Sequence, residues 1–281
     1  MMKWIRRLIM YPLVAIITLI AVLLFFNPAI YYHIEGMIGL KLLWYGYEEK
    51  ANELIEKSIS NSDGVSAELF RIYSIDNTKS GNYEESTKYL NKAADLDSAN
   101  VDGYFGWCLL YYYRDYDKAL FHLERLDNST SFIDYIGDDN ILYAKGLCYK
   151  QKGNYPKALE LFQLAIEHES KDNGANSVPY QIYFQTGRTL DLLNRPSEAI
   201  EFYNLAIEDW EGSSESIYYK GLAEIELGIA TGCQNLEIAL EKVSKGIKSS
   251  DTYVRLFDEI YVDQVEEMIR SKCTPNNPLR N

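Results

Sequence analysis

Small side chains recur along this chain at intervals close to 34 residues, and this repetition constrains the fold more than any other feature. The positions are Gly39, Ser74, Cys108, Gly146, Gly187 and Gly221, with steps of 35, 34, 38, 41 and 34 residues. The two long steps contain residues 127–140 and 170–179, which are rich in Asp, Asn, Ser and Gly, as loops are. Such a chain is expected to stack similar units around a core that grows in one dimension.

The clearest unit runs from Ile141 to Ser170 and reads as two helices joined by the Gly-Asn-Tyr-Pro turn at residues 153–156. Its spaced residues are Gly146, Ala158, Phe162 and Ala165, and the next unit repeats them as Gly187, Ala199, Tyr203 and Ala206. Twelve residues separate the Gly from the first Ala in both units. Small residues let two helices approach closely, and a large residue four positions after the Ala lies on the same helical face and fills the gap.

Four further units follow this spacing less completely. The expected pairs are Gly39 with Ala51, Ser74 with Ser86, Cys108 with Ala119 after the loss of one residue, and Gly221 with Ala239 across an enlarged turn at residues 228–233.

Residues 35–248 therefore resemble the tetratricopeptide repeat, in which a Leu-Gly-x-x-Tyr helix precedes an Ala-x-x-x-Phe helix. No unit ends in Pro, and the Leu-Gly pair is never complete. The resemblance implies an all-α, right-handed superhelical solenoid of helical hairpins. Residues 28–250 would form the array, and residues 251–281 would form a capping helix over 251–272 followed by a frayed tail.

The resemblance also implies a concave groove lined by the first helix of each hairpin. Carried over, its lining consists of Phe105, Leu109, Tyr112, Tyr143, Leu147, Lys150, Phe184, Arg188, Asp191, Tyr218, Leu222 and Ile225. Aromatic residues with a few charges suit an extended or helical peptide. Only Lys150 and Arg188 resemble the set with which some family members grip a terminal carboxylate, so no such clamp is predicted.

The N-terminal 27 residues read as a cytosolic end and a membrane helix. Residues 8–26 form an uncharged, apolar run of nineteen residues, which spans about 30 Å as a helix. A cleaved signal peptide is the alternative, but its apolar region is usually only about 7–15 residues long. Lys3, Arg6 and Arg7 precede the run and predict a cytosolic N-terminus. In a bacterium with two membranes the repeats would lie in the periplasm.

Charge and motifs narrow the classes of function. Residues 1–34 contain three of the 28 basic residues and none of the 41 acidic ones, so the rest carries 25 against 41, a formal charge of −16. Such a body would repel phosphate backbones, and no nucleic-acid partner is expected. The three histidines, His33, His122 and His168, lack metal-ligand spacing, and the phosphate-loop and hydrolase motifs are missing. No enzyme activity, metal, cofactor or small-molecule substrate is predicted.

The four cysteines divide into two pairs. Cys108 and Cys148 occupy inward positions of first helices and read as small buried residues. Cys233 and Cys273 lie near the C-terminus, and outside the cytosol they could bridge the end helix to the last unit.

Two functions remain open. The first is a membrane-anchored scaffold that binds a partner protein or peptide in the groove and assembles or assists an envelope complex. The alternative is a structural subunit whose main contacts come from the membrane helix and the first repeat.

Overall fold

The computed structural model of the chain describes residue 18 and residues 27–61, 66–173 and 177–273. The predicted membrane helix falls outside these ranges, apart from Thr18. Inside them, no helix is both long enough and apolar enough to cross a bilayer. The chain divides after Val101 into two compact units, which are described separately.

The first unit consists of two helical hairpins, α2 (Pro28–Trp44) with α3 (Glu48–Ser60) and α4 (Ala67–Lys79) with α5 (Tyr83–Leu96). Pro28 occupies the first turn of α2, where its fixed φ suits a helix start and its missing N–H leaves no bond unmade. A Cβ built on Gly39 would lie 2.8 Å from the Ile55 side chain, so α2 and α3 touch at the predicted small residue. Ser74 and Ser86 are likewise fully buried.

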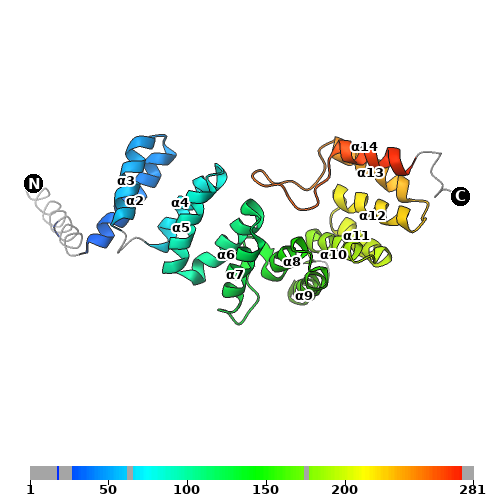
Figure 1. Ribbon diagram of the computed structural model, residues 1–281, viewed down its shortest axis with the longest axis horizontal. Helices are drawn as coiled ribbons and strands as arrows, with labels where there is room; N and C mark the ends of the chain where they lie inside the picture. The colour runs from blue at the N-terminus through cyan, green and yellow to red at the C-terminus, as the bar shows by residue number, and fades with distance from the viewer. Residues whose placement is uncertain (1–17, 19–26, 62–65, 174–176, 274–281) are drawn as a thin grey trace, which may run out of the picture. The chain divides into compact units, whose positions relative to one another are not determined.

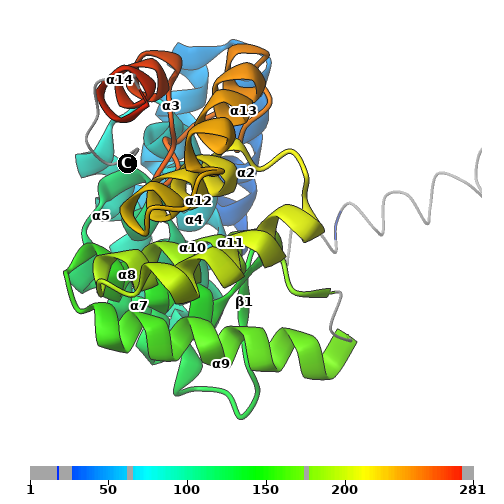
Figure 2. The same cartoon turned by 90° about the vertical axis from the view of Figure 1, so that its right-hand side faces the viewer.

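The second unit continues the series and adds a short β-hairpin and a last helix. Its elements are α6 (Ser98–Cys108), which crosses the division, a π-helical turn (Leu109–Tyr113), α7 (Tyr116–Asp127), β1 (Tyr135–Ile136), β2 (Asp139–Asn140), α8 (Ile141–Gln151), α9 (Tyr155–Asn173), α10 (Tyr180–Leu192), α11 (Pro196–Asp209), α12 (Ser214–Glu226), α13 (Gly232–Ser244) and α14 (Val262–Lys272). Successive helices pack antiparallel as hairpins, and α9 lies along both α8 and α10 (Figure 2).

The predicted contact between small and large residues holds the two central hairpins together. A Cβ on Gly146 would lie 2.5 Å from Phe162 Cε1, and one on Gly187 would lie 2.7 Å from Tyr203 Cε1. Phe162 and Tyr203 are fully buried. Each ring therefore packs directly against the backbone of the preceding helix, which explains why glycine stands at these positions.

Each of these hairpins turns at a residue with left-handed backbone seven positions after the small residue. Gly153 has φ 79° and Asn194 has φ 56°. Beyond the first of these, the Asn154 N–H donates to the Tyr149 carbonyl at 2.9 Å and closes the end of α8.

The third hairpin corrects one predicted pair. Gly106, and not Cys108, is the contact position, because its Cβ would lie 2.7 Å from Leu123 Cδ2. Thirteen residues then separate Gly106 from Ala119, one more than in the central hairpins. The π-helical turn Leu109–Tyr113 accommodates the extra residue, since such a turn inserts one residue into an α-helix. The unit gains a residue where a lost one was predicted.

The last hairpin corrects a second pair. A Cβ on Gly221 would lie 2.9 Å from the Gly232 carbonyl oxygen and 3.1 Å from Leu236, so Gly232 takes the place predicted for Ala239. Helix α13 starts at Gly232, and five residues, 227–231, separate it from α12, against three between α8 and α9, so the turn is enlarged as predicted although the contact pair differs. Gly228, with φ 71°, still lies seven residues after Gly221.

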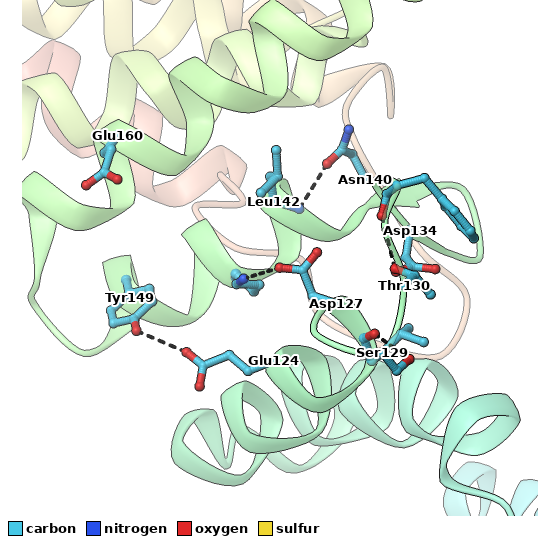
Figure 3. A network of polar contacts seen from close by, with 12 residues as sticks. Glu124, Asp127, Ser129, Thr130, Asp134, Asn140, Leu142, Tyr149 and Glu160 are labelled. Atoms are coloured by element: carbon cyan, nitrogen blue, oxygen red, sulfur yellow. Dashed lines mark hydrogen bonds and ion pairs between the residues drawn. The ribbon is translucent and has the colours of Figure 1, made fainter.

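Residues 127–140 do more than link two hairpins. They include the strand pair β1–β2, in which Tyr135 faces Asn140, where the sequence predicted only a loop. Figure 3 shows the polar contacts here. Asp127 accepts a bond from Lys145 at 2.7 Å, Glu124 accepts one from Tyr149 at 3.3 Å, and Asn140 caps α8 by accepting from the Leu142 N–H at 2.9 Å. These bonds join α7 to α8 and fix the start of α8.

The C-terminal helix is shorter than predicted. Helix α14 spans only Val262–Lys272, whereas the sequence predicted one from Asp251. Residues 249–261, which we call the strap, are not helical and form the long stretch between α13 and α14 in Figure 1. The predicted linker 170–179 is also shorter, because α9 continues to Asn173.

Candidate functional site

The strap lies on the first helices of four consecutive hairpins in the second unit. Its residues contact Tyr111 and Arg114 after α6, Lys150 of α8, Arg188 of α10 and Glu215 of α12. These helices are the ones expected to line the concave groove. The chain therefore covers part of this surface with its own C-terminal segment.

Side chains within the strap explain why it is not helical. Asp251 accepts hydrogen bonds from the N–H groups of Tyr253 and Val254, at 2.7 and 2.9 Å. Glu259 accepts one from the Leu256 N–H at 2.7 Å, and Asp258 has a left-handed φ of 58°. Such local bonds compete with helical ones. The apolar side chains of Phe257 and Ile260 instead pack against neighbouring helical residues.

A buried ionic contact fixes the middle of the strap. Asp258 accepts bonds from Lys150 and, at 3.3 Å, from Arg188 Nε. Burial alone would raise the pKa of Asp258, but the two cations hold it below its usual value. Burial lowers the pKa of Lys150, which is only 4% exposed and also donates to Gln185 at 2.5 Å. We call Asp258, Lys150 and Arg188 the charge lock.

An aromatic contact fixes the strap beside this lock. The Phe257 ring lies 5.8 Å from that of Tyr111 and 6.4 Å from that of Tyr116, between centroids. The Arg114 guanidinium lies 4.1 Å from the Phe257 ring and also donates to the Arg255 carbonyl. The strap is thus attached through charge, ring contact and a backbone hydrogen bond.

A pocket of about 370 Å³ stays open between the strap and the helices. Its aromatic lining consists of Trp107, Tyr111, Tyr143, Tyr180, Phe184 and the strap's Phe257. Its acidic lining consists of Asp138, Asp139, Glu215, Asp251 and Glu259. Neither lysine nor arginine is among the described residues that line it.

Burial raises the pKa of two of these acids, Asp139 and Glu215. It raises the pKa of Asp139 to about 6, although Asp139 accepts a bond from the Tyr111 hydroxyl at 2.8 Å. It also raises the pKa of Glu215, which accepts bonds from the Ser249 N–H and hydroxyl at 3.1 and 3.3 Å. Glu259 instead pairs with Lys248 at 3.4 Å. Asp139 and Glu215 are the pocket acids most affected by burial.

The residues predicted to line a groove fall into three sets. Tyr143 and Phe184 line the pocket, and Lys150 and Arg188 belong to the charge lock. The others pack within or between hairpins. Four of them are at most 2% exposed: Phe105, Leu109, Leu147 and Tyr218. Tyr112 contacts the Trp107 ring, Leu222 and Ile225 border the core of the last hairpin, and Asp191 accepts hydrogen bonds from Tyr203 and Arg188. The structure brings only the first two sets together.

Sequence reasoning missed several residues of the site. Trp107, Tyr111, Tyr180 and Glu215 lie at helix positions outside the carried-over set. The acids of the β1–β2 hairpin were assigned to a plain linker. A signal for the strap was present, since residues 251–262 are rich in β-branched and aromatic side chains, which favour extended backbone.

A disulfide links α13 to the residue after α14, the helix that follows the strap. It joins Cys233 in the first turn of α13 to Cys273 after α14, with Cα atoms 5.7 Å apart. Cys108 and Cys148 are buried and lie outside this disulfide. No group of three or more potential metal-binding His, Cys, Asp or Glu side chains occurs in the ranges that the structure describes.

Comparison with known proteins assigns the central hairpins. Residues 138–211 match the sequence model of the family described as tetratricopeptide repeat. The match is confined to these residues and is in keeping with the predicted tetratricopeptide spacing. They contain α8 to α11, the two hairpins with the most regular spacing. None of the curated proteins compared with the chain matches it.

Solved structures resemble the chain over a larger part of its length. PilW, described as a widely conserved type IV pilus biogenesis factor, aligns with TM-score 0.55 and 14% identity over 78% of this chain and 95% of its own. PilF of Pseudomonas aeruginosa aligns with TM-score 0.55 and 17% identity over 78% and 94%. MamA from Desulfovibrio magneticus RS-1 aligns with TM-score 0.54 and 16% identity over 64% and 96%. These likenesses show the fold, an all-α tetratricopeptide-like solenoid.

Proposed function

We propose that the chain is a tetratricopeptide scaffold that binds a segment of a partner protein in the pocket between the strap and the helices. One observation carries this proposal: the pocket remains open while the strap is in place. Its volume of about 370 Å³ falls within the range of about 300–1,000 Å³ that is common for ligand sites. Its mixed aromatic and acidic lining offers both anchoring surface and polar contacts.

We further propose that residues 8–26 anchor the scaffold in a bacterial inner membrane, with the repeats in the periplasm. The apolar run and the preceding basic residues support this. The disulfide Cys233–Cys273 is in keeping with an oxidising compartment. An assembly role at the cell envelope would parallel the pilus biogenesis factor, whose fold this chain resembles. Protease treatment of intact spheroplasts tests the placement: digestion of the repeats from outside is expected, and full protection would contradict it.

A photo-crosslinking residue placed at the pocket edge tests the binding function. Gln181 is exposed and lines the pocket, so p-benzoyl-phenylalanine at this position should crosslink the partner in membranes. Glu201 is exposed on α11 and away from the pocket lining, and the same probe there serves as the matched control. A defined adduct from position 181 but not from 201 is expected. Equal adducts from both positions, or none from 181, would argue against the pocket.

The structural-subunit alternative has one observation in its favour. Helix α2 exposes several apolar side chains, each between 42% and 48% exposed: Ile30, Ile34, Met37 and Ile38. These could contact other membrane subunits. Replacing Ile34 and Ile38 with Ser should abolish complex formation if this alternative holds, and should leave the crosslink from position 181 intact if the pocket carries the function.

A further inference from the structure

We infer that the pocket selects a cationic side chain, arginine or lysine, presented by an extended segment of the partner. This inference rests on the proposed function of the pocket and adds the chemistry of its ligand. It would give the scaffold specificity for basic segments.

The first support is unbalanced charge. Asp138, Asp139 and Glu215 line the pocket, and none of the three forms an ion pair among the described residues. Glu215 is 1% exposed and Asp139 is half-buried, so water can compensate their charge only in part. A buried carboxylate without a counterion favours any ligand that brings a positive charge.

Three cations that contact acids of the strap are already engaged there. Lys150 and Arg188 share Asp258 in the charge lock, and Arg188 also pairs with Asp191 at 3.2 Å. Lys248 pairs with Glu259 at 3.4 Å, although its charge also lowers the pKa of Glu215 to some extent. Within the described ranges, the chain therefore supplies partners for Asp258 and Glu259 but pairs neither Asp138 nor Asp139 with a cation.

The second support is the aromatic wall. Trp107, Tyr143, Tyr180 and Phe184 line the same space as the unpaired acids. Aromatic faces attract ammonium and guanidinium groups, and guanidinium also stacks on them. The chain already uses this contact beside the pocket, where the Arg188 guanidinium lies 3.7 Å from the Tyr219 ring. Aromatic rings and carboxylates together discriminate a cation from a neutral polar side chain.

Other ligand classes fit less well. An acidic side chain would face the like charges of Asp138, Asp139 and Glu215, which raises its free energy in the pocket. An aliphatic side chain would bury the carboxylates further without a counterion. The volume of about 370 Å³ admits one long side chain, and the exposed edge at Gln181 lets the peptide backbone continue outward.

Peptide titration of the full chain in detergent micelles tests the inference. The probes are acetyl-Gly-Ser-Xaa-Ser-Gly-amide peptides with arginine, glutamine, leucine or glutamate at the central position. Trp107 lines the pocket, so tryptophan fluorescence can report binding, with calorimetry as the second readout. The arginine peptide is expected to bind about tenfold or more tightly than the glutamine peptide, as a charge-assisted contact implies.

Two charge-removing variants locate the effect. Asp139→Asn and Glu215→Gln should each remove most of the preference for arginine over glutamine. The control Glu201→Gln should preserve it, because this exposed acid lies outside the pocket lining. Far-ultraviolet circular dichroism verifies that each variant is folded, and Asp139→Asn, at a half-buried position, provides a test if Glu215→Gln does not fold.

The outcomes separate this inference from the function on which it rests. Equal binding of the arginine and glutamine peptides, or tighter binding of the leucine or glutamate peptide, would overturn the cation preference and leave the pocket as a peptide site. A preference for arginine that survives both variants would also overturn it. If no peptide binds, the inference fails, and crosslinking from position 181 then decides whether the proposed function fails with it.

Discussion

The charge lock should govern how firmly the strap is held, and Asp258→Asn breaks it with the least change in shape. The substitution removes the negative charge that Lys150 contacts, while Lys150 stays 4% exposed. Removal of one partner from a buried ion pair costs about 3–5 kcal/mol. The lower end applies here, because Arg188 keeps Asp191 at 3.2 Å and the new amide still offers one acceptor oxygen.

A cost of about 3 kcal/mol raises the population of the released strap about 150-fold, since 1.4 kcal/mol corresponds to a factor of ten. Trypsin cleavage after Arg255, an exposed strap residue, measures this population under native conditions when opening is fast relative to cleavage. The rate for Asp258→Asn should rise by about two orders of magnitude, and that for Glu201→Gln should match the unmodified chain. A rate for Asp258→Asn within about threefold of the unmodified chain would refute the lock.

A double-mutant cycle adds a sharper test. Lys150→Met removes the buried cation and keeps an unbranched side chain, so combined with Asp258→Asn it should recover part of the lost stability. We expect a coupling free energy of at least about 1 kcal/mol between the two positions. Strictly additive effects in chemical denaturation would contradict a direct ion pair.

The charge lock should also weaken as pH falls below about 3.8, because the pKa of Asp258 is depressed in the folded chain and protonation removes its stabilising charge.

Three further perturbations probe the rest of the unit. Gly187→Ala should lower the free energy of unfolding by about 1–3 kcal/mol, because its Cβ would lie 2.7 Å from Tyr203. Thermal melting measures this, with Ser197→Ala at an exposed position as the control. Equal melting temperatures of the two variants would contradict the close contact. Replacing both cysteines of the Cys233–Cys273 bridge with serine should lower the free energy of unfolding by about 2–4 kcal/mol, and a reductant should have a comparable effect on the unmodified chain. A reductant that destabilises the serine variant further would contradict this assignment. Asp139→Asn should raise stability by about 1 kcal/mol at pH 7 and by nothing near pH 4, since a folded pKa of about 6 against 3.8 makes stability fall as pH rises between these values. The exposed neighbour Asp138→Asn is its control, and a gain of Asp139→Asn that is independent of pH would contradict the assignment.

Local spacing predicted the hairpins well where the repeat is regular. The contacts of Gly146 with Phe162 and of Gly187 with Tyr203 follow from residues that lie within one hairpin. The third and sixth hairpins were paired wrongly because one residue was gained or lost. A π-helical turn accommodates the residue gained in the third hairpin, and in the sixth the contact falls on the first residue of α13; neither change leaves a clear mark in a pattern of small residues.

The candidate site was less accessible to such reasoning. Lys150 and Arg188 were predicted to line a groove that binds a partner peptide. Both instead contact Asp258, which follows Lys150 by 108 residues. The apolar residues of 251–261 read equally well as a helical face, because a helix and a strap docked in a groove both need buried apolar side chains. Contacts between distant segments decide between the two.

The sequence alone determined the repetition, and with it the helical hairpins, because the small and large residues that touch belong to the same hairpin, as Gly146 and Phe162 do at a separation of 16 positions. Only the tertiary structure decided what occupies the groove. The strap gains its stability from ion pairs, ring contacts and burial against four hairpins at once, and the pocket exists only between the strap and those hairpins. The small residues thus set the spacing of the units, and long-range charge pairing set the surface that a partner would meet.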